Sequence, residues 1–278
     1  MMTLLILVGI LLAIVFGVRR YVASLDSQQK TAIKDGINEV FVRAEREGRF
    51  PRHPAFETDY LRDYPGLQKI EENYSVIREE CEALMQRREN LVPMASLGGG
   101  YTAGDTHSAQ WTTLMFKSGQ FIEENCELAP RTAAVLRGVP RVYTAFFSVL
   151  EPNQHIQPHY GYYKGFIRYH MGVMVPRNNA DECCWIRVNA DPDDNAADDK
   201  GLIDRGERYF WHDGEGVMLD DTFMHEAAND SDEVRVILFL DVARRMPWYL
   251  DLFNRLVLFV IHREASVRRI REAARIKL

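Results

Sequence analysis

The sequence predicts a mainly β fold with flanking helices, preceded by a transmembrane helix. From Arg141 onward, short runs rich in β-branched and aromatic residues alternate with turn-forming stretches. The crossover helices that a parallel sheet would require are not visible between them, so we expect an antiparallel sandwich or barrel such as a jelly roll. The first 18 residues carry no charged side chain. The runs expected to be strands are VYTAFFSVL, FIRYHMGVMV, CCWIRV, GVMLDD and VRVILFLDV.

With 278 residues, the chain suits one large domain or a core domain with terminal additions. Hydrophobic residues make up 46% and charged residues 27% of the chain, which is typical of a globular protein. We expect residues 1–20 to be the transmembrane anchor and 21–92 to be a helical linker with helices that pack on the core. Residues 93–246 then form the β domain, and 247–278 form a C-terminal amphipathic basic helix.

The segments ahead of the β domain are mostly helical in pattern. Apolar residues at helical spacing predict one helix over Ala32–Arg49 and a longer one over Leu67–Asn90. Gln110–Lys117 reads as a strand, and Asn125–Arg137 as a helix broken by Pro130. We expect the first helix to pack on the core or to lie on the bilayer rather than to form a binding module. The apolar stripe of the second helix is expected to belong to the core.

The N-terminal run Met1–Val18 is followed directly by Arg19 and Arg20. At 1.5 Å per residue, a helix of this run is roughly 27 Å long, close to the thickness of the hydrocarbon core. A cleaved signal peptide would carry its basic residues before the apolar run, which favours an uncleaved anchor. Basic residues on the C-terminal side predict a single-pass protein of the inner membrane whose remaining chain faces the cytoplasm.

The net charge and the cysteines indicate which partners and which redox compartment to expect. The net charge of −6 and pI near 5.8 argue against nucleic-acid binding, which needs a basic face. The four cysteines form no CxxC pair, and adjacent Cys183 and Cys184 imply no disulfide framework. We expect reduced thiols, which agrees with the cytoplasmic orientation.

The C-terminal stretch combines an apolar half with a basic half. Trp248, Leu252 and Leu256 belong to the apolar half, and several arginines follow it. This is the composition of an interfacial helix on anionic lipid. A helix docked on the sheet or on a second subunit would explain the apolar half equally well, and both alternatives stay open. The sequence does not indicate the oligomeric state.

Histidines and arginines among the predicted strands indicate a metal next to an anion. His159 and His225 come from separate strands, and two imidazoles can meet at one iron-like ion. Arg168 and His170 are two residues apart on one strand, so they point to the same face. Arg235 alternates with apolar residues, and a buried arginine is costly unless an anion pairs with it. A carboxylate of a cosubstrate would fit a guanidinium fork.

Four short motifs in this region resemble the aspartyl/asparaginyl β-hydroxylase family of Fe(II)- and 2-oxoglutarate-dependent dioxygenases. The motifs are PHYG, IRYH, DDTFMHEAAND and VRVILFLD, and the resemblance covers roughly Arg141 to Pro247. It implies a double-stranded β-helix, a cupin-like jelly roll. It also implies that 2-oxoglutarate and O₂ are consumed while a C–H bond is hydroxylated. The residues it implies are His159 and His225 as iron ligands, and Ser148, Arg168, His170 and Arg235 as 2-oxoglutarate contacts, with Arg235 on the distal carboxylate.

The sequence departs from the wider superfamily at the third metal ligand. Most such oxygenases use two histidines and one carboxylate. The carboxylate position, two after His159, is Gly161 here, and the resemblance implies a branch that lacks this ligand and has water in its place. Asp220 or Asp221 is the alternative third ligand, although both are expected to shape the turn before His225. His155 and His212 match no ligand position and are expected to be structural.

Three alternative functions would explain this pattern of residues. The first is hydroxylation of a membrane lipid acyl chain, as in the bacterial lipid A and ornithine-lipid hydroxylases that the chain most resembles. The anchor and the basic C-terminal stretch favour it because they hold the site at a bilayer. The second is aspartyl/asparaginyl hydroxylation of a protein, whose vertebrate examples face an oxidising lumen. The third is a non-catalytic scaffold, which the retained histidines and arginines disfavour.

Overall fold

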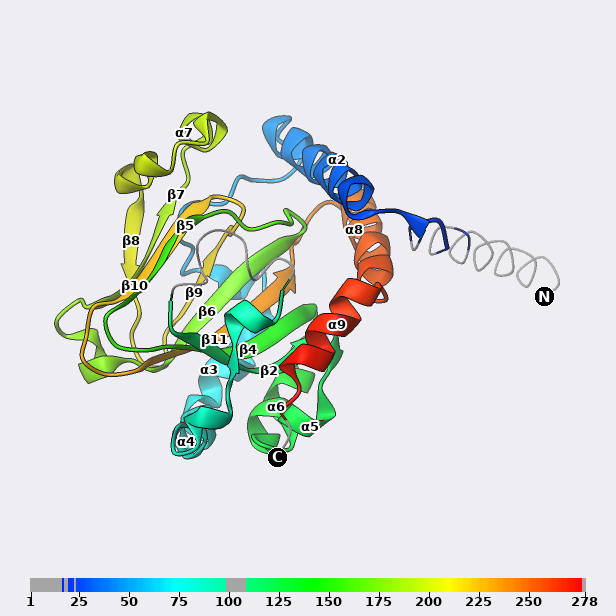
Figure 1. The fold of residues 1–278 in the computed structure, drawn as a ribbon. Coiled ribbons are helices and arrows are strands. Elements are labelled where there is room, and N and C mark those ends of the chain that lie inside the picture. Colours follow the sequence, from blue (N-terminus) through cyan, green and yellow to red (C-terminus); the bar gives the residue numbers. More distant parts are fainter. Residues whose placement is uncertain (1–16, 18–19, 23, 99–108, 277–278) are drawn as a thin grey trace.

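The computed structural model describes residues 17, 20–22, 24–98 and 109–276 (Figure 1). Nearly all of the predicted transmembrane anchor, residues 1–16, 18 and 19, lies outside these described residues. In the part that is described, no helix has the length and apolar character needed to cross a bilayer. The anchor therefore stays a prediction.

The described strands form two antiparallel sheets that face each other, which confirms the predicted cupin-like β fold with flanking helices (Figure 1). The larger sheet has seven strands in the order β1-β2-β4-β11-β6-β9, with β3 paired to β2, and the smaller has the order β5-β10-β7-β8. The strands of the large sheet are β1 Val92–Pro93, β2 Trp111–Ser118, β3 Gln120–Phe121, β4 Val142–Leu150, β6 Phe166–Met174, β9 Gly216–Leu219 and β11 Arg235–Ala243. Those of the small sheet are β5 Gln154–His159, β7 Cys184–Asn189, β8 Glu207–Phe210 and β10 Met224–Asn229.

Side chains of the central strands point alternately to the two faces of the large sheet, so they contribute to two different hydrophobic clusters. Leu238 and Leu240 of β11 join the cluster between the large sheet and the helices, which also contains Phe147. Ile237 points the other way, into the cluster between the two sheets with Trp211. Because successive side chains point to opposite faces, the odd-numbered positions of β11 all face the space between the sheets. Arg235 is one of them, so the strand period places a charge inside the molecule.

The helices agree with the sequence in type and differ in their bounds. The α2 helix begins five residues before the predicted start because Asp26 caps it in a capping box with Gln29. The predicted helix Leu67–Asn90 is interrupted at Asn73, whose side-chain Nδ2 donates to the Lys69 carbonyl. The predicted break at Pro130 is confirmed, since Pro130 opens α6. The helices are α2 Ser27–Arg46, α3 Gln68–Glu72, α4 Tyr74–Met85, α5 Glu123–Cys126, α6 Pro130–Arg137, α7 Pro192–Ala197, α8 Trp248–Ile261 and α9 Ala265–Ala274.

The C-terminal stretch expected as one helix forms two, α8 and α9, separated around Glu264. The α9 helix packs on β2. One face of α8 packs on a third cluster that contains Phe41 of α2 and Phe166 of β6. The stretch is therefore docked on the domain, while the other face of α8 remains uncovered.

Candidate functional site

The two predicted metal ligands lie side by side between the sheets. Strands β5 and β10 pair so that His225 is directly opposite His159, and the ring centroids are 4.2 Å apart. Each Nδ1 lies 2.8 Å from a backbone carbonyl, that of Gln157 for His159 and that of Phe223 for His225. We infer that each Nδ1 donates to its carbonyl, which places the lone pair on Nε2. Both imidazoles are thereby oriented as metal ligands usually are.

Burial keeps both rings in the neutral form that binds metal. Desolvation lowers the pKa of His159 to about 4. The pKa of His225 is also well below its usual range, because of burial and then of the adjacent His159. Neutral imidazole is the ligand form, so neither ring has to lose a proton near pH 7 before a metal binds.

The structure gives a steric reason for Gly161. A Cβ at this position would lie 1.9 Å from Asp221 Oδ2, and the Gly161 amide donates to the Asp221 carbonyl at 2.6 Å. A carboxylate side chain therefore has no room two residues after His159. Within the described residues, no cluster of three or more His, Cys, Asp or Glu side chains is arranged to hold one metal. Asp220 and Asp221 pair instead with basic side chains.

Restoring a side chain at Gly161 is expected to damage the site rather than to complete it. Gly161→Ala pushes on Asp221, and overpacking of this kind costs about 1–3 kcal/mol of unfolding free energy. Thermal unfolding of the purified chain measures this loss. Gly36→Ala is the control, because nothing lies within 4 Å of its Cβ position, and it should leave stability equal or slightly higher. Equal stability of the two variants would contradict the close approach of Asp221.

Arg235 supplies a positive charge that no carboxylate among the described residues neutralises. It is 1% exposed, its Nε has no hydrogen-bond partner, and its Nη1 makes only a long bond of 3.5 Å to the Ser148 carbonyl. The guanidinium lies over the Trp211 ring, 4.7 Å from the ring centroid. Burial lowers its pKa to about 10. Binding an anion would offset the cost of burying this unpaired guanidinium.

Ser148 and His170 line the same pocket as Arg235 and the two histidines. The Ser148 hydroxyl accepts a hydrogen bond from Trp111 Nε1 at 2.8 Å. His170 is buried and neither ring nitrogen has a partner, and burial lowers its pKa well below the usual range. The pocket is thus an apolar chamber with a few polar groups directed into it. Its lining residues are Trp111, Ser148, Ile156, His159, Arg168, His170, Ile186, Trp211, His225, Ala227, Arg235, Ile237 and Phe239.

Arg168 also lines this pocket, but its charge is matched within the protein. Its Nη2 lies 2.8 Å from Asp221 and 3.1 Å from Asp241. Its guanidinium lies 4.2 Å from the Phe239 ring centroid. The role of Arg168 as a 2-oxoglutarate contact therefore stays a prediction. Arg235, which has no carboxylate partner among the described residues, is better suited to bind a carboxylate of a ligand.

Asp220 holds a buried ion network beside the site. Lys164 Nζ lies 2.7 Å from Asp220 Oδ2 and 3.1 Å from Glu45 of α2, and Arg244 pairs with the same Asp220 oxygen. These cations hold the pKa of Asp220 well below its usual range, despite its complete burial. The network ties α2 to the turn that precedes His225.

Removing Asp220 is expected to destabilise the fold strongly. Asp220→Ala leaves Lys164 short of one partner and Arg244 without its buried counter-charge, and breaking a buried pair costs about 3–5 kcal/mol. Denaturant unfolding measures the loss. Because the folded-state pKa is lowered, the stabilisation is present above the ordinary aspartate pKa and is lost as the pH falls through the lowered value. A variant that unfolds like the wild type at neutral pH would contradict this role.

The sequence did not point to Trp111, Trp211 or Asp241, and it indicated Asp221 only as a turn residue or an alternative third metal ligand. Trp111 and Trp211 form aromatic walls, and Asp221 and Asp241 neutralise Arg168. Asp241 could have been found, since it lies on the same face of β11 as Arg235. Trp211 lies outside the regular strands, so no periodicity marked it. His155 and His212 line no part of the pocket and instead bond to Glu226 and to the Asn178 carbonyl, as expected of structural histidines.

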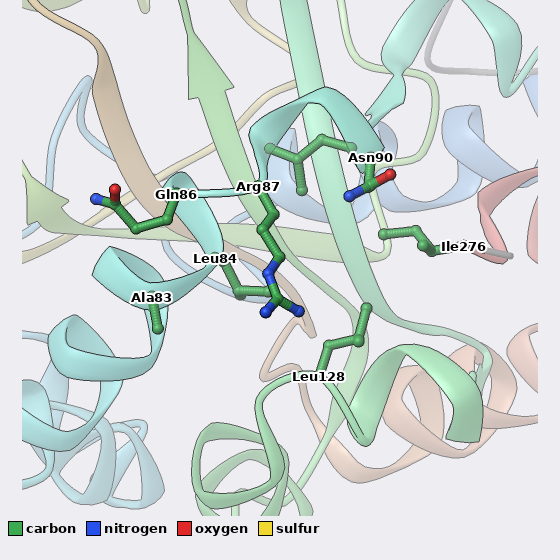
Figure 2. A pocket seen from close by; sticks show the side chains of 8 residues that line it. Ala83, Leu84, Gln86, Arg87, Asn90, Leu128 and Ile276 are labelled. Carbon is green, nitrogen blue, oxygen red and sulfur yellow. The ribbon is translucent and has the colours of Figure 1, made fainter. Parts of the chain in front are cut away.

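A larger cavity of about 420 Å³ lies elsewhere, next to α4 and the C-terminal end of the described chain (Figure 2). Leu84, Leu128 and Ile276 point toward it, together with Arg87. Its lining side chains contain no histidine, cysteine or carboxylate. Of these two cavities, the smaller one contains the histidine pair.

The sequence of this chain is similar to a family profile and to known proteins. The family profile described as "Aspartyl/Asparaginyl beta-hydroxylase" matches residues 71–245. The ornithine lipid ester-linked acyl 2-hydroxylase of Rhizobium tropici is 30% identical over 181 residues, covering 65% of this chain and 58% of that protein. The human aspartyl/asparaginyl beta-hydroxylase is 26% identical over 191 residues, covering 67% of this chain and 21% of that protein.

Among solved structures, the carbocyclase SnoK of nogalamycin biosynthesis, which is non-heme and α-ketoglutarate dependent, aligns with a TM-score of 0.39 and 14% identity. That alignment covers 62% of this chain and 74% of the carbocyclase. The chain matches less than two thirds of the length of either relative named above. The family profile nevertheless includes every predicted site residue from Ser148 to Arg235. The chain therefore belongs to the aspartyl/asparaginyl β-hydroxylase family.

Proposed function

We propose that this chain is an Fe(II)- and 2-oxoglutarate-dependent hydroxylase. The observation that carries the proposal is the buried Arg235, which has no carboxylate partner among the described residues and lines the same pocket as the histidine pair. The guanidinium fits one end of a dicarboxylate whose other end reaches the metal. Iron and 2-oxoglutarate, when bound, would supply the oxidising chemistry. In this reaction 2-oxoglutarate, O₂ and a C–H bond become succinate, CO₂ and C–OH.

The residues of the chain bind, orient and exclude water. His159 and His225 would hold iron through Nε2, because each Nδ1 is taken by a backbone carbonyl. Arg235 would bind the distal carboxylate of 2-oxoglutarate, and Ser148, Arg168 and His170 would line its path. Trp211, Phe239 and Ile186 make the walls apolar, which keeps water from competing in the pocket. The unmatched polar atoms of His170 and Arg235 fit a polar ligand in this chamber.

The proposed substrate is the acyl chain of a membrane lipid. The Rhizobium relative is named for acyl hydroxylation of ornithine lipid. The uncharged run Met1–Val18, followed by Arg19 and Arg20, supports a location at the cytoplasmic face of the inner membrane. Hydroxylation of an aspartyl or asparaginyl side chain in a protein is the second candidate, supported by the name of the human relative.

Lipid mass spectrometry distinguishes the two candidates. Cells that express the wild-type chain should contain a lipid heavier by one oxygen on an acyl chain than cells that lack it. Cells that express His225→Ala should match the cells that lack the chain, because the metal site is lost. A lipid profile unchanged by the wild-type chain, together with an oxidised peptide, would overturn the lipid assignment in favour of the second candidate.

A further inference from the structure

The α8 helix is apolar on both of its faces. Leu250, Val257 and Leu258 are buried in the cluster that also contains Phe41 of α2. A helix on the surface of a soluble domain normally presents polar residues on the opposite side. The outer face of α8 instead presents large hydrophobic side chains, with Trp248 78% and Leu252 62% exposed. The exposed set is Trp248, Tyr249, Leu252, Phe253, Leu256 and Phe259.

The α2 helix lies beside α8 and extends this surface (Figure 1). The rings of Phe41 and Phe253 are 5.9 Å apart, and Lys30 pairs with Glu264 at 3.1 Å. Ile33 and Val40 of α2 are exposed, and their seven-residue spacing puts them on one helix face. Exposed apolar side chains of this number on two neighbouring helices are typical of a surface that meets a membrane or another protein.

Both helices are joined to the loop that follows the metal ligand His159. Asn38 of α2 donates to the Tyr162 carbonyl at 2.9 Å and accepts from the Lys164 amide at 3.0 Å. Asn254 of α8 accepts from the Tyr163 hydroxyl at 2.6 Å and donates to the Gly165 carbonyl at 2.9 Å. Whatever the two helices dock on is therefore held next to the rim of the site.

The charge around the exposed face points to an anionic surface. Residues 247–278 contain seven arginines and lysines against three acidic residues, whereas the whole chain carries a net charge of −6. Arg263 lies over the Phe259 ring at 3.6 Å from its centroid, at the end of the apolar face. Arg268 and Arg269 of α9 are exposed. An apolar face bordered by arginines matches the boundary between acyl chains and phosphate headgroups.

We propose that the exposed face of α8, with Ile33 and Val40 of α2, docks on an anionic lipid bilayer. The uncharged run Met1–Val18, which is separated from the start of α2 by eight residues, favours a bilayer over a protein partner. The docked helices hold the loop after His159 at the membrane surface, so an acyl chain can enter the pocket without crossing water. The docking rests on exposure and charge, and only the delivery of an acyl substrate rests on the proposed function.

Trp248 reports this contact directly. It is the most exposed of the four tryptophans, since Trp185 and Trp211 are buried and Trp111 is half-buried. The full chain is reconstituted in vesicles of phosphatidylcholine and phosphatidylglycerol whose acyl chains carry bromine, which quenches tryptophan on contact. Wild-type emission should be quenched strongly, and the emission that remains in Trp248→Phe should be quenched little. Quenching should weaken when phosphatidylglycerol is omitted.

A charged double variant tests the face itself. Leu252→Glu with Leu256→Glu should remove most of the quenching of Trp248, because two carboxylates cannot enter the acyl region. Ser75→Glu with Ala83→Glu adds the same charge at exposed positions of α4 and should leave the quenching unchanged. Equal quenching of the wild type and Trp248→Phe would overturn the proposal that α8 docks on lipid. Burial of α8 in a self-associated form of the chain, without quenching by the lipid, would also overturn it. The measurement needs neither iron nor 2-oxoglutarate, so it can fail or succeed independently of the proposed reaction.

Discussion

Replacing His159 or His225 by alanine is expected to abolish both Fe(II) binding and 2-oxoglutarate turnover. Each ring would present Nε2 to the metal, because Nδ1 is inferred to donate to a carbonyl. Within the described residues no third acidic, cysteine or histidine side chain completes the pair, so losing one ring removes half of the protein ligands. The loss should exceed the roughly 10- to 100-fold effect of removing an outer-shell partner. Anaerobic Fe(II) titration and succinate formation measure the two effects.

His155→Gln is the matched control for this prediction. His155 is on the same strand β5 as His159, but its ring bonds to Glu226 and does not line the pocket. The control should bind Fe(II) and form succinate as the wild type does. Circular dichroism confirms that each variant is folded. Turnover in a folded His159→Ala or His225→Ala variant equal to that of the control would rule out the histidine pair as the metal site.

Replacing Arg235 by methionine is expected to raise the 2-oxoglutarate requirement far more than the Fe(II) requirement. Truncating one partner of a buried charge pair costs about 2–5 kcal/mol of binding free energy. The unfolding free energy of the ligand-free protein should not fall by a comparable amount, because Arg235 is buried without a carboxylate partner among the described residues. The KM for 2-oxoglutarate and the rise in unfolding temperature that 2-oxoglutarate causes both measure the effect.

Arg208→Met is the control for Arg235→Met. Arg208 is exposed and lies over the Trp185 ring, away from the pocket lining. It should leave the KM for 2-oxoglutarate unchanged. Arg235→Met could instead raise the Fe(II) and 2-oxoglutarate requirements equally. That result would show that Arg235 supports the pocket as a whole and does not bind the distal carboxylate.

Much of the β domain follows from local sequence patterns. The five predicted runs correspond to β4, β6, β7, β9 and β11, because buried strands need unbroken β-branched and aromatic residues. The strands of His159 and His225, β5 and β10, were expected without bounds, and β8 was not predicted. These strands carry polar residues such as Glu226, whose side chain bonds to His155 on another strand. Pairing between distant segments cannot be read from a single segment, so the bounds of these strands did not follow from the sequence.

The sequence alone determined the family and the β fold and predicted the site residues, because strand period and motif are local properties. Only the tertiary structure decided how those residues are used. It shows that Asp221 occupies the space beside Gly161 and pairs with Arg168, while Arg235 has no such partner among the described residues. It also shows that α8 is docked on one face and exposed on the other. These outcomes depend on which side chains distant segments bring together, and packing between segments is a property of the folded chain.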